Sequence, residues 1–515
     1  MHSHQPSSSP DADGSSPALS PDELALQQQR RDKQQSYVSD LAAILPQSAI
    51  LTTDQQLLPY ESDGLTAIKQ KPLLVVLPET IVQVQDIMRW ANQLGVPVVA
   101  RGAGTGLSGG ASPHPDGILM GLAKFNRILE LSTDEGRAVV QPGVRNLAIS
   151  DAARPHGLYY APDPSSQIAC SIGGNVAENS GGVHCLKYGL TVHNIIELKV
   201  VTATGDLLTV NGASGEQDGY DLLALLTGSE GMLAITVEIT VKLLPVPPVA
   251  KLLMAAFDSV ESAGSAVGAV IAAGVIPAGM ELMDNPAIRA SEAFAECGYP
   301  LDAAALILCE LDGLEEEVEA QMQQVQSVFE TCGSVSMHIA QSEEERLLLW
   351  KGRKSAFPAV GRLSPDYSCI DGTIPRKALP QVLARMNELS EEYELRIANV
   401  FHAGDGNLHP LILFDSNIPG ELHKTEELGS KILQLCVQVA GTITGEHGVG
   451  LEKINEMCVQ FDQSTLVQFH TLKAAFDPKG ILNPGKAIPT LQRCAEFGAM
   501  HVHGGQLPFP HLERF

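Results

Sequence analysis

Residues 101–110, RGAGTGLSGG, and residues 161–189, APDPSSQIACSIGGNVAENSGGVHCLKYG, are the two glycine-rich stretches that decide the fold. The first follows the apolar run VPVVA at 96–100 and satisfies the G-x-G-x-x-G pattern of a dinucleotide site. That site needs a helix that begins within the glycines, and Pro113 and Pro115, followed by another β-like run, exclude such a helix here. The first stretch is therefore either a plain turn or a loop whose backbone N–H groups form an anion-binding nest.

The second stretch sets glycines beside short polar side chains. Residues of these types expose backbone amides and hydrogen-bonding groups while they leave room for a flat ligand. Two loops of this kind in one small domain are hard to explain as turns, so we expect a ligand site between them. The residues concerned are Ser165, Ser171, Gly173, Gly174, Asn175, Asn179, Gly181 and Gly182.

The composition of the chain excludes several classes of protein. Its 515 residues suffice for about three domains, and a 44% hydrophobic content is typical of a globular protein. The 34 basic and 60 acidic side chains leave a formal net charge of −26, which argues against nucleic acid or anionic lipid as a partner because both are bound by clustered Lys and Arg. No stretch approaches the roughly 18–20 apolar residues that span a bilayer, and the first residues match neither a secretory signal nor a transit peptide. We therefore expect a cytoplasmic protein.

The nine cysteines are dispersed and include no C-x-x-C pair, so neither a zinc ribbon nor a local iron–sulfur cluster is indicated. Reduced and mostly buried thiols are the expectation for a cytoplasmic chain. The cysteines are Cys170, Cys185, Cys297, Cys309, Cys332, Cys369, Cys436, Cys458 and Cys494.

The N-terminal region contains a tail and a helix. Residues 1–20 are rich in Ser, Pro and Asp and cannot bury enough apolar surface to become ordered. The pattern from residue 21 to about residue 45, with Ser20 as a cap, predicts a helix. The segment TTDQQLLPYESD that follows is predicted to be a loop.

The rest of the chain divides into two α+β parts. Short β-like runs dominate residues 70–245, with one helix of 3.6-residue period at 80–94. After the stiff connector LPVPP at 244–248, helix-like and strand-like runs alternate, which favours a second α+β unit on an antiparallel sheet. The predicted strands lie at 73–77, 96–100, 138–141, 197–202, 234–244, 305–311, 396–402 and 408–414, and the later helices at 259–273, 314–332, 378–393, 421–440 and 465–476.

Three histidines and a glutamate give the clearest chemical signal. The motif FHAGDGNLHPLILF puts His402 and His409 at the inner ends of two strand-like runs, so that a hairpin would bring both imidazoles together. The motif TGEHGVG adds Glu446 and His447. Two histidines and a carboxylate form a ligand set for Zn²⁺, Mn²⁺ or Fe²⁺ that leaves open positions for substrate, although a GDGN turn between two strands needs no metal.

The motifs RGAGTGLSGG, PDPSSQIACSIGGNVAENSGG and GSEGMLAIT resemble the FAD-binding domain of the vanillyl-alcohol-oxidase and p-cresol-methylhydroxylase flavoprotein family. The similarity covers nearly the whole chain after the tail. It is closest to the FAD-linked oxidoreductase branch that includes the flavoprotein subunits of bacterial glycolate dehydrogenases (glycolate oxidases) and the D-lactate and D-2-hydroxyglutarate dehydrogenases.

This resemblance implies an α+β fold, in which a two-subdomain FAD-binding domain is joined to an α+β substrate-binding cap with an antiparallel sheet. The expected boundaries are a disordered tail at 1–20, a helical segment at 21–67, the FAD-binding domain at 68–246, the substrate- and metal-binding cap with a helical closure that returns to the flavin at 247–490, and a C-terminal tail at 491–515.

The resemblance also implies where FAD binds. It places the pyrophosphate against 101–110, the isoalloxazine against the loops of 161–182, and LNPGK (482–486) close to the flavin. Noncovalent FAD is expected, with His184 and Cys185 as the side chains that leave a covalent tether open. The implied cofactor-binding residues are Arg101, Gly102, Gly104, Thr105, Gly106, Ser108, Gly109, Gly110, Pro162, Asp163, Ser165, Ser171, Gly173, Gly174, Asn175, Asn179, Gly181, Gly182, Ile235 and Asn483.

Carried over residue by residue, the resemblance makes His402, His409 and Glu446 the ligands of a divalent metal (Zn, Mn or Fe) and His447 the general base. These roles suit the oxidation of a 2-hydroxyacid. A metal chelated by the hydroxyl and carboxylate oxygens lowers the hydroxyl pKa, and a neutral histidine can then take the proton, while hydride passes to flavin N5.

A carboxylate substrate also needs a cation. Arg353, in LLLWKGRKSAF, matches the position that binds the substrate carboxylate in the family, and its planar fork suits bidentate recognition. Without the resemblance, Lys351, Arg353 and Lys354 fit a solvated basic turn equally well.

The implied substrate is a small 2-hydroxyacid. Where hydroxyglutarate-specific relatives carry polar contacts to a second carboxylate, this chain places Phe357, Cys369 and Leu411. That favours glycolate, oxidised to glyoxylate, with D-lactate or a broader range of D-2-hydroxyacids as the alternative. A noncatalytic FAD-binding subunit of a redox complex is an alternative of another class, and the presence of the histidine and glutamate set argues against it.

Reduced FAD must be reoxidised, and the sequence offers no second redox centre and no NAD site. The resemblance implies a second FAD-binding subunit and an iron–sulfur subunit as partners. It also implies that the complex is peripheral on the inner membrane face of a bacterium and touches the membrane only through these partners. The segment from Cys494 to Phe515 is either a docking tail or a strap on its own domain.

Overall fold

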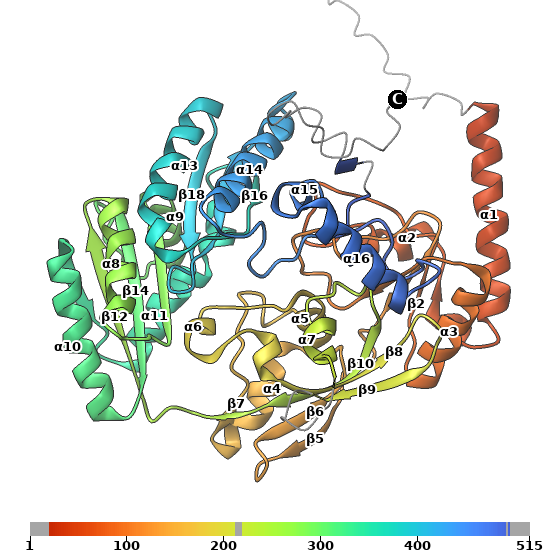
Figure 1. Cartoon of the computed structure of the whole chain (residues 1–515), viewed down its shortest axis with the longest axis horizontal. Helices are drawn as coiled ribbons and strands as arrows, with labels where there is room; N and C mark the ends of the chain where they lie inside the picture. Colours follow the sequence, from red (N-terminus) through yellow and green to blue (C-terminus); the bar gives the residue numbers. More distant parts are fainter. Residues whose placement is uncertain (1–19, 212–218, 491–492, 495–515) are drawn as a thin grey trace, which may run out of the picture.

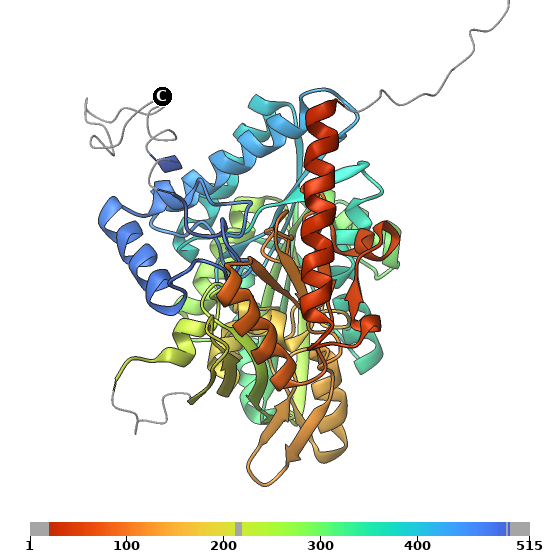
Figure 2. The ribbon, with the colours of Figure 1, turned by 90° about the vertical axis from the view of Figure 1, so that its right-hand side faces the viewer.

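The computed structural model describes residues 20–211, 219–490 and 493–494. The N-terminal tail and most of the predicted C-terminal docking tail therefore lie outside the described residues. The long helix α1 (Pro21–Leu41) runs along one side of the molecule (Figure 2). Figure 1 shows the chain in two halves, with β2, β8 and β10 in one half and β12, β14 and β18 in the other.

The first half begins with a strand–helix–strand unit. Strands β2 (Leu74–Val76) and β3 (Val98–Arg101) both pair in parallel with β4 (Ile118–Gly121), which lies between them, and β1 (Ile50–Leu51) completes a four-stranded sheet. The connecting helix α3 (Ile81–Leu94) starts at a capping box formed by Thr80 and Gln83 and ends at the left-handed Gly95. It buries its apolar face on this sheet. Because β3 ends at Arg101, the first glycine loop starts at the end of an outer strand of this sheet.

The second glycine-rich stretch lies in a connection between strands of a five-stranded antiparallel sheet. The order of this sheet is β5 (Ile128–Ser132), β6 (Arg137–Val140), β10 (Ile235–Lys242), β8 (Ile195–Val201) and β9 (Leu207–Asn211). The helices α4 (Asn146–Ala153), α5 (Ile172–Glu178), α6 (Cys185–Tyr188) and α7 (Leu222–Leu226) lie in the connections. Helices α4, α5 and α7 share one apolar core with this sheet, so the loops around α5 rest on a rigid base.

The second half is a seven-stranded sheet in which every pairing is antiparallel. The order is β15 (Ser334–Ile339), β12 (Val249–Phe257), β14 (Ala305–Gly313), β13 (Gly279–Asp284), β18 (Arg396–Phe401), β20 (Pro410–Phe414) and β16 (Asp366–Cys369). Two short pairs stand apart from the three large sheets, β7 (Leu158–Tyr159) with β11 (Leu244–Pro245) and β17 (Gly372–Thr373) with β19 (Asn407–Leu408).

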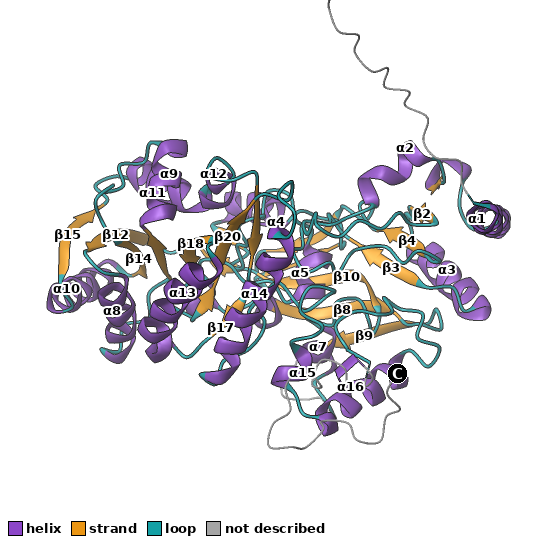
Figure 3. Cartoon of the chain, turned by 90° about the horizontal axis from the view of Figure 1, so that it is seen from above, coloured by secondary structure: helices purple, strands orange, loops and turns teal. Residues whose placement is uncertain are grey.

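Helices cover both faces of the seven-stranded sheet (Figure 3). Alternate residues of β12 and β14 enter two different cores, as the two-residue period of a strand requires. One core takes in α8 (Val260–Ala272), α10 (Glu315–Thr331), α13 (Leu379–Tyr393) and α14 (Glu421–Gln438). The other takes in α9 (Asn285–Ala295), α11 (Glu343–Lys354) and α12 (Ala356–Val360).

The end of the described chain returns to the first half. After α15 (Met457–Gln460) and α16 (Gln463–Phe476), Leu482 forms a parallel bridge with Val98 of β3. The backbone of Val98 donates to Ile481 O at 2.7 Å and accepts from Asn483 N at 2.9 Å. The segment LNPGK thus lies beside the strand that leads into the first glycine loop.

The expected α+β organisation with an antiparallel second sheet is confirmed, and the predicted strands and helices are present with shifts of a few residues at their ends. Two predictions were wrong. The segment TTDQQLLPYESD is not all loop, because Thr53 and Gln56 form a capping box that starts the short helix α2 (Asp54–Leu57), and a 3₁₀ turn follows. Of the nine cysteines, Cys458 and Cys494 form a disulfide across 36 residues, and the other seven are free. The dispersed spacing of the cysteines in the sequence did not indicate that Cys458 of α15 and Cys494 lie next to each other in the fold.

No helix in the part of the chain that the structure describes is both long and apolar enough to cross a membrane.

Candidate functional site

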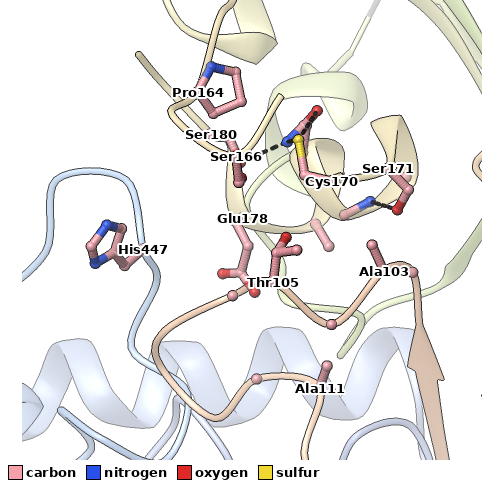
Figure 4. Close-up of a pocket in the computed structure, with 18 of the residues that line it drawn as sticks. Ala103, Thr105, Ala111, Pro164, Ser166, Cys170, Ser171, Glu178, Ser180 and His447 are labelled. Atoms are coloured by element: carbon pink, nitrogen blue, oxygen red, sulfur yellow. Dashed lines mark hydrogen bonds between the residues drawn. The ribbon is translucent and has the colours of Figure 1, made fainter. Parts of the chain in front are cut away.

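A cavity of about 500 Å³ lies between the two glycine-rich loops. Its walls come from the loop after β3, from residues 164–180 and from the segment between α7 and β10, and on one side from the second half of the molecule. Figure 4 shows this meeting, with His447 on one side and Thr105, Ala111 and Ser171 on the other. Its volume lies within the range of small-molecule and cofactor sites.

Glycine is required where the two loops touch. A Cβ on Gly102 would lie 2.2 Å from Ser171 Oγ, and one on Gly173 would lie 2.5 Å from the Cβ of Pro142. Ser171 itself caps α5 by accepting a hydrogen bond from Gly174 N. The close approach leaves backbone amides and small side chains on the cavity wall, a cradle that suits the long, flat and anionic FAD molecule.

Twelve of the predicted cofactor-binding residues line the cavity, and eight do not. The twelve are Arg101, Gly102, Gly104, Thr105, Gly106, Gly110, Ser165, Ser171, Gly173, Gly174, Asn175 and Ile235. The eight behind the wall are Ser108, Gly109, Pro162, Asp163, Asn179, Gly181, Gly182 and Asn483.

Several of these eight residues support the loops instead. Asn483, in a left-handed backbone conformation at φ 41°, donates from Nδ2 to Gly110 O and Glu230 O. Asn179, at φ 55°, ends α5 and accepts from Val192 N. Asn483 holds backbone that forms the wall, and Asn179 ties the end of α5 to Val192, so we interpret their motif positions as structural support of the site.

The predicted metal ligands converge. His402 Nε2 and His409 Nε2 lie 3.3 and 3.0 Å from the same oxygen of Glu446, Oε1, and the two rings are 5.0 Å apart and nearly perpendicular. The β18–β20 pairing sets the first two, because His402 follows β18 and His409 precedes β20. The second oxygen of Glu446 accepts from Gly181 N at 2.9 Å, which links this cluster to the glycine-rich loop.

The donor set fits a divalent metal ion. One donor atom from each of His402, His409 and Glu446 lies within 4.8 Å of the others. His402 Nδ1 is bound to Glu281 Oε1 at 2.8 Å, which leaves Nε2 for an ion, an arrangement common around metal-binding histidines. Burial alone would raise the pKa of Glu446, but His402 and His409 hold it well below the usual range of a glutamate.

In a second possible donor set, one donor atom from each of Cys369, His409 and His447 also lies within 4.8 Å of the others. Burial raises the pKa of the Cys369 thiol well above its ordinary value, and Asp371 adds to that shift. A metal there would have to deprotonate a thiol that resists it. The imidazole and carboxylate set is therefore the better candidate.

His447 lines the cavity beside this cluster. Its ring stacks on His409 with centroids 4.9 Å apart and planes 9° apart, and its Nδ1 is buried with no hydrogen-bond partner among the described residues. Burial lowers the pKa of His447 to about 4, and the histidine is therefore neutral near pH 7. A neutral imidazole at the cavity wall can accept a proton.

The turn that carries Glu446 and His447 is organised by Asp371, which the sequence analysis did not identify. This fully buried carboxylate accepts hydrogen bonds from the backbone N–H groups of residues 445, 446 and 447 and from Thr444 Oγ1. Lys453, also fully buried, pairs with it at 3.0 Å. Asp371 thus fixes the direction of both side chains. In the sequence, Asp371 is only a lone carboxylate between the short strands β16 and β17.

Arg353 lies in the last turn of α11 and is almost fully buried, so the solvated-turn alternative is wrong for this residue. Its Nε and Nη2 contact Glu281 Oε2 at 2.8 and 2.5 Å. Its Nη1 is buried and finds no hydrogen-bond acceptor in the described part of the chain. Arg353 does not line the cavity, whereas its neighbour Lys354 does, at 3.5 Å from Asp163.

Glu281 of β13 joins two of the predicted functional residues and was also missed. One of its oxygens binds His402 and the other binds Arg353, and the side chain is 1% exposed. Burial alone would raise the pKa of Glu281, but Arg353 and His402 hold it below the ordinary value. The residue therefore orients a metal-ligand candidate and the candidate carboxylate receptor together.

His184 lies between the two halves of the molecule. Its Nδ1 is 2.9 Å from Asp163 Oδ2 and its Nε2 is 3.1 Å from Glu310 Oε1 on β14. Glu310 Oε2 in turn accepts from Arg346 and Trp350 of α11. Burial alone would lower the pKa of His184, but the two carboxylates raise it to about 10.

Neither His184 nor Cys185, the two candidates for a covalent tether, lines the cavity. Both ring nitrogens of His184 are occupied by carboxylates, and Cys185 is a buried free thiol. The expectation of noncovalent FAD is therefore kept as a proposal.

Comparison with known proteins relates both halves to flavoproteins. Residues 72–211 match the FAD binding domain family, and residues 246–487 match the C-terminal domain of FAD linked oxidases. The chain is 62% identical over 480 residues to the glycolate oxidase subunit GlcD of Escherichia coli strain K12, covering 93% of this chain and 96% of that protein.

More distant relatives also match over most of this chain and most of their own length. The glycolate oxidase subunit GlcD of Bacillus subtilis is 38% identical over 430 residues, covering 83% of this chain and 92% of that protein. A D-lactate dehydrogenase of Archaeoglobus fulgidus is 33% identical over 423 residues, with 81% and 92% covered.

Solved structures share the fold at low sequence identity. A substrate-bound p-cresol methylhydroxylase matches with a TM-score of 0.78 at 17% identity, covering 90% of this chain and 98% of that one. The 4-ethylphenol oxidase from Gulosibacter chungangensis gives 0.75 at the same identity and coverage.

Proposed function

The chain belongs to the family of FAD-linked oxidases, as its motifs predicted, and from this premise we propose that it oxidises glycolate to glyoxylate with FAD as cofactor. The 62% identity to a glycolate oxidase subunit over 93% of the chain supports the substrate. One observation carries the chemistry: His409, Glu446 and His447 of the second half face the cavity formed by the glycine loops of the first.

The residues of the chain divide the work of the reaction. Bound FAD would supply N5 as the hydride acceptor, and a divalent ion, which His402, His409 and Glu446 would hold, would supply the charge that acidifies the substrate hydroxyl. His447 accepts the hydroxyl proton at a ring nitrogen, for which its neutral state suits it.

Two cations are candidates to bind the substrate carboxylate, although Arg353 does not itself line the cavity. Arg353 offers a buried Nη1 without a partner among the described residues, and Lys354 lines the cavity itself. Glu281 holds the guanidinium of Arg353 in place. We assign the carboxylate contact to Arg353, with Lys354 as a second charge that favours an anionic substrate.

The sequence identities to known relatives distinguish between glycolate and D-lactate as the substrate. A D-lactate dehydrogenase is 33% identical to the chain, against 62% and 38% for two glycolate oxidase subunits, so glycolate is the better supported acid. A noncatalytic FAD-binding subunit would have no use for the converging histidines at its cavity wall.

The relatives are named as subunits, which supports a complex of several chains. We propose a second FAD-binding subunit and an iron–sulfur subunit as partners that carry electrons away from the flavin, with the complex in the bacterial cytoplasm, peripheral on the inner membrane face.

Anaerobic mixing tests the proposed function. The purified, metal-analysed protein is mixed without oxygen with glycolate, D-lactate, L-lactate or D-2-hydroxyglutarate, and the flavin absorbance is followed. Glycolate should bleach the flavin faster than the other acids, and a chelator should abolish the bleaching. A yellow protein that glycolate does not bleach, alone or with its partner subunits, would contradict the proposal.

Phe357 is expected to restrict the substrate to small acids. Its ring lines the cavity, and its centroid is 6.4 Å from that of His409. We predict that Phe357→Ala raises the kcat/KM ratio of D-2-hydroxybutyrate to glycolate about tenfold or more, since one methylene in a pocket is worth about 1–3 kcal/mol. Steady-state kinetics with both acids measures the ratio.

The matched control is Phe294→Ala, which removes a phenylalanine that is 39% exposed on α9. It should leave the ratio unchanged. An unchanged ratio in Phe357→Ala as well would show that another residue sets the size limit.

A further inference from the structure

Two carboxyl groups meet at the cavity wall, and neither has a role in the reaction described above. Glu178 ends α5, Glu230 lies between α7 and β10, and both line the cavity. A Cβ added at Gly448 would lie 2.2 Å from Glu178 Oε2 and 3.0 Å from Glu230 Oε1. The two carboxyls therefore approach each other across the turn that carries His447.

The surroundings of the two carboxyls differ. Glu230 Oε1 accepts from Val449 N and Glu230 Oε2 from Gly450 N, each at 2.7 Å. Two backbone donors stabilise a carboxylate. Glu178 Oε2 is buried and has no hydrogen-bond partner in the described part of the chain. When two close carboxyls cannot both be ionised, the proton goes to the one without donors, which is Glu178.

The charges around Glu178 agree with this assignment. Burial raises the pKa of Glu178 well above its ordinary value, and the charges of Glu230 and Asp63 raise it further, while Lys453 and Lys486 act in the opposite direction. Burial also raises the pKa of Glu230, and the hydrogen bonds from Val449 N and Gly450 N counter part of that rise.

The carboxyl of Glu178 also faces the first glycine loop. Its Oε1 would lie 2.9 Å from a Cβ added at Gly110 and 3.8 Å from one at Gly106. Figure 4 shows the side chain beside Thr105, inside the cavity. This is the loop that the family resemblance places against the pyrophosphate of FAD.

We propose that Glu178 is a neutral carboxylic acid at physiological pH and donates a hydrogen bond to bound FAD. The cofactor presents phosphate oxygens, ring carbonyls and ring nitrogens, which are acceptors, and its phosphates are anionic. A protonated carboxyl complements them, whereas a carboxylate at the same place repels them. This inference rests on FAD binding and is independent of the substrate.

The affinity for FAD as a function of pH tests the proposal. The flavin-free full-length protein is titrated with FAD, and flavin fluorescence gives the Kd from about pH 6 to about pH 10. Because FAD favours the protonated acid, affinity stays constant below the pKa of Glu178 in the free protein. Above it, Glu178 makes the affinity fall by up to tenfold per pH unit. Glu178→Gln keeps a donor but cannot ionise, so it should bind FAD within about tenfold of wild type near pH 7 and lack this component of the fall.

The pH dependence of FAD affinity is compared between the wild type and the variant, because Lys486 also contributes to the slope of each profile. Burial lowers the pKa of Lys486 to about 8, so this lysine also loses charge in the same range. It is present in both proteins, but the charge of Glu178 also acts on its pKa, so the difference between their profiles reports Glu178 together with its coupling to Lys486. The control Glu130→Gln changes an exposed carboxylate on β5 and should reproduce the wild-type profile.

Infrared spectroscopy of the FAD-loaded enzyme gives a second readout. A carboxylic acid C=O band near neutral pH should disappear in Glu178→Gln and persist in Glu130→Gln. If Glu178→Gln does not fold, Glu178→Thr, which keeps a hydroxyl donor, takes its place. This variant should also lack the part of the fall in FAD affinity with pH that depends on Glu178, and it should also lack the carboxylic acid C=O band.

Identical pH profiles of the wild type and the Glu178 variant, or no band that depends on Glu178, would overturn the proposal. An enzyme that behaves as expected here but is not bleached by glycolate would instead overturn only the proposed function.

Discussion

The variant His447→Gln is expected to bind FAD normally and to be reduced by glycolate at least about a hundredfold more slowly than the wild type. The side chain lines the cavity, stacks on His409 and is neutral near pH 7, so it can receive the hydroxyl proton. Glutamine fills similar space but accepts no proton. Stopped-flow measurement of flavin bleaching under anaerobic conditions gives the rate, and the flavin spectrum gives the FAD content.

The matched control is His423→Gln, since His423 is an exposed histidine on α14 with 75% of its side chain accessible. It should bleach at the wild-type rate. Near-normal bleaching in His447→Gln would exclude this histidine as the base. Loss of FAD from the variant would show that the residue is needed for the site to form.

The second large effect is expected from His402→Ala, which should lose both the metal ion and activity while FAD stays bound. His402 Nε2 lies 3.3 Å from Glu446 Oε1, and its other nitrogen is fixed by Glu281. Changes to outer partners of metal ligands already weaken metal binding or activity about 10–100-fold, so loss of a ligand should exceed that. Elemental analysis after gel filtration measures the metal, and anaerobic bleaching measures the activity.

The variant Cys369→Ser separates the two possible donor sets. It removes a thiol from the alternative set of Cys369, His409 and His447 and leaves His402, His409 and Glu446 intact. We expect it to keep its metal. A metal lost from Cys369→Ser but retained by His402→Ala would assign the ion to the other set, and an active, metal-free His402→Ala would remove the metal from the reaction.

The parts of the site whose residues lie close together in the sequence, in short motifs, could be predicted from the sequence. The many small residues of the glycine loops at 101–110 and 161–182 indicated a ligand site, and residues of both loops line the cavity. His402 and His409 flank one tight turn, so a hairpin was enough to bring them together. The carboxylate Glu446 came from a second motif; its residue type made it a candidate ligand beside the two histidines, and the resemblance strengthened that assignment.

The supporting carboxylates could not be found in this way. Glu281 lies within β13 and Asp371 directly precedes β17, and nothing in their local sequence distinguishes them from exposed acidic residues. Their partners lie at positions 353, 402 and 445–447, which only the folded sheet brings near. Likewise, Glu178 and Glu230 are 52 positions apart and meet only because α5 and the segment after α7 both face the same cavity.

The partly buried histidine between Asp163 and Glu310 also bears on how the enzyme moves. His184 is one link through which a loop of the flavin half holds a strand of the cap, and Arg346 and Trp350 complete the contact. A hinge motion that swung the halves apart would separate His184 from Glu310, while Asp163, which lies in the same half as His184, would stay with it. The buried carboxylate of Glu310 would then lose one of its cationic partners, which costs free energy. Substrate and product exchange is therefore expected to proceed by local side-chain and loop motion within a closed two-part shell.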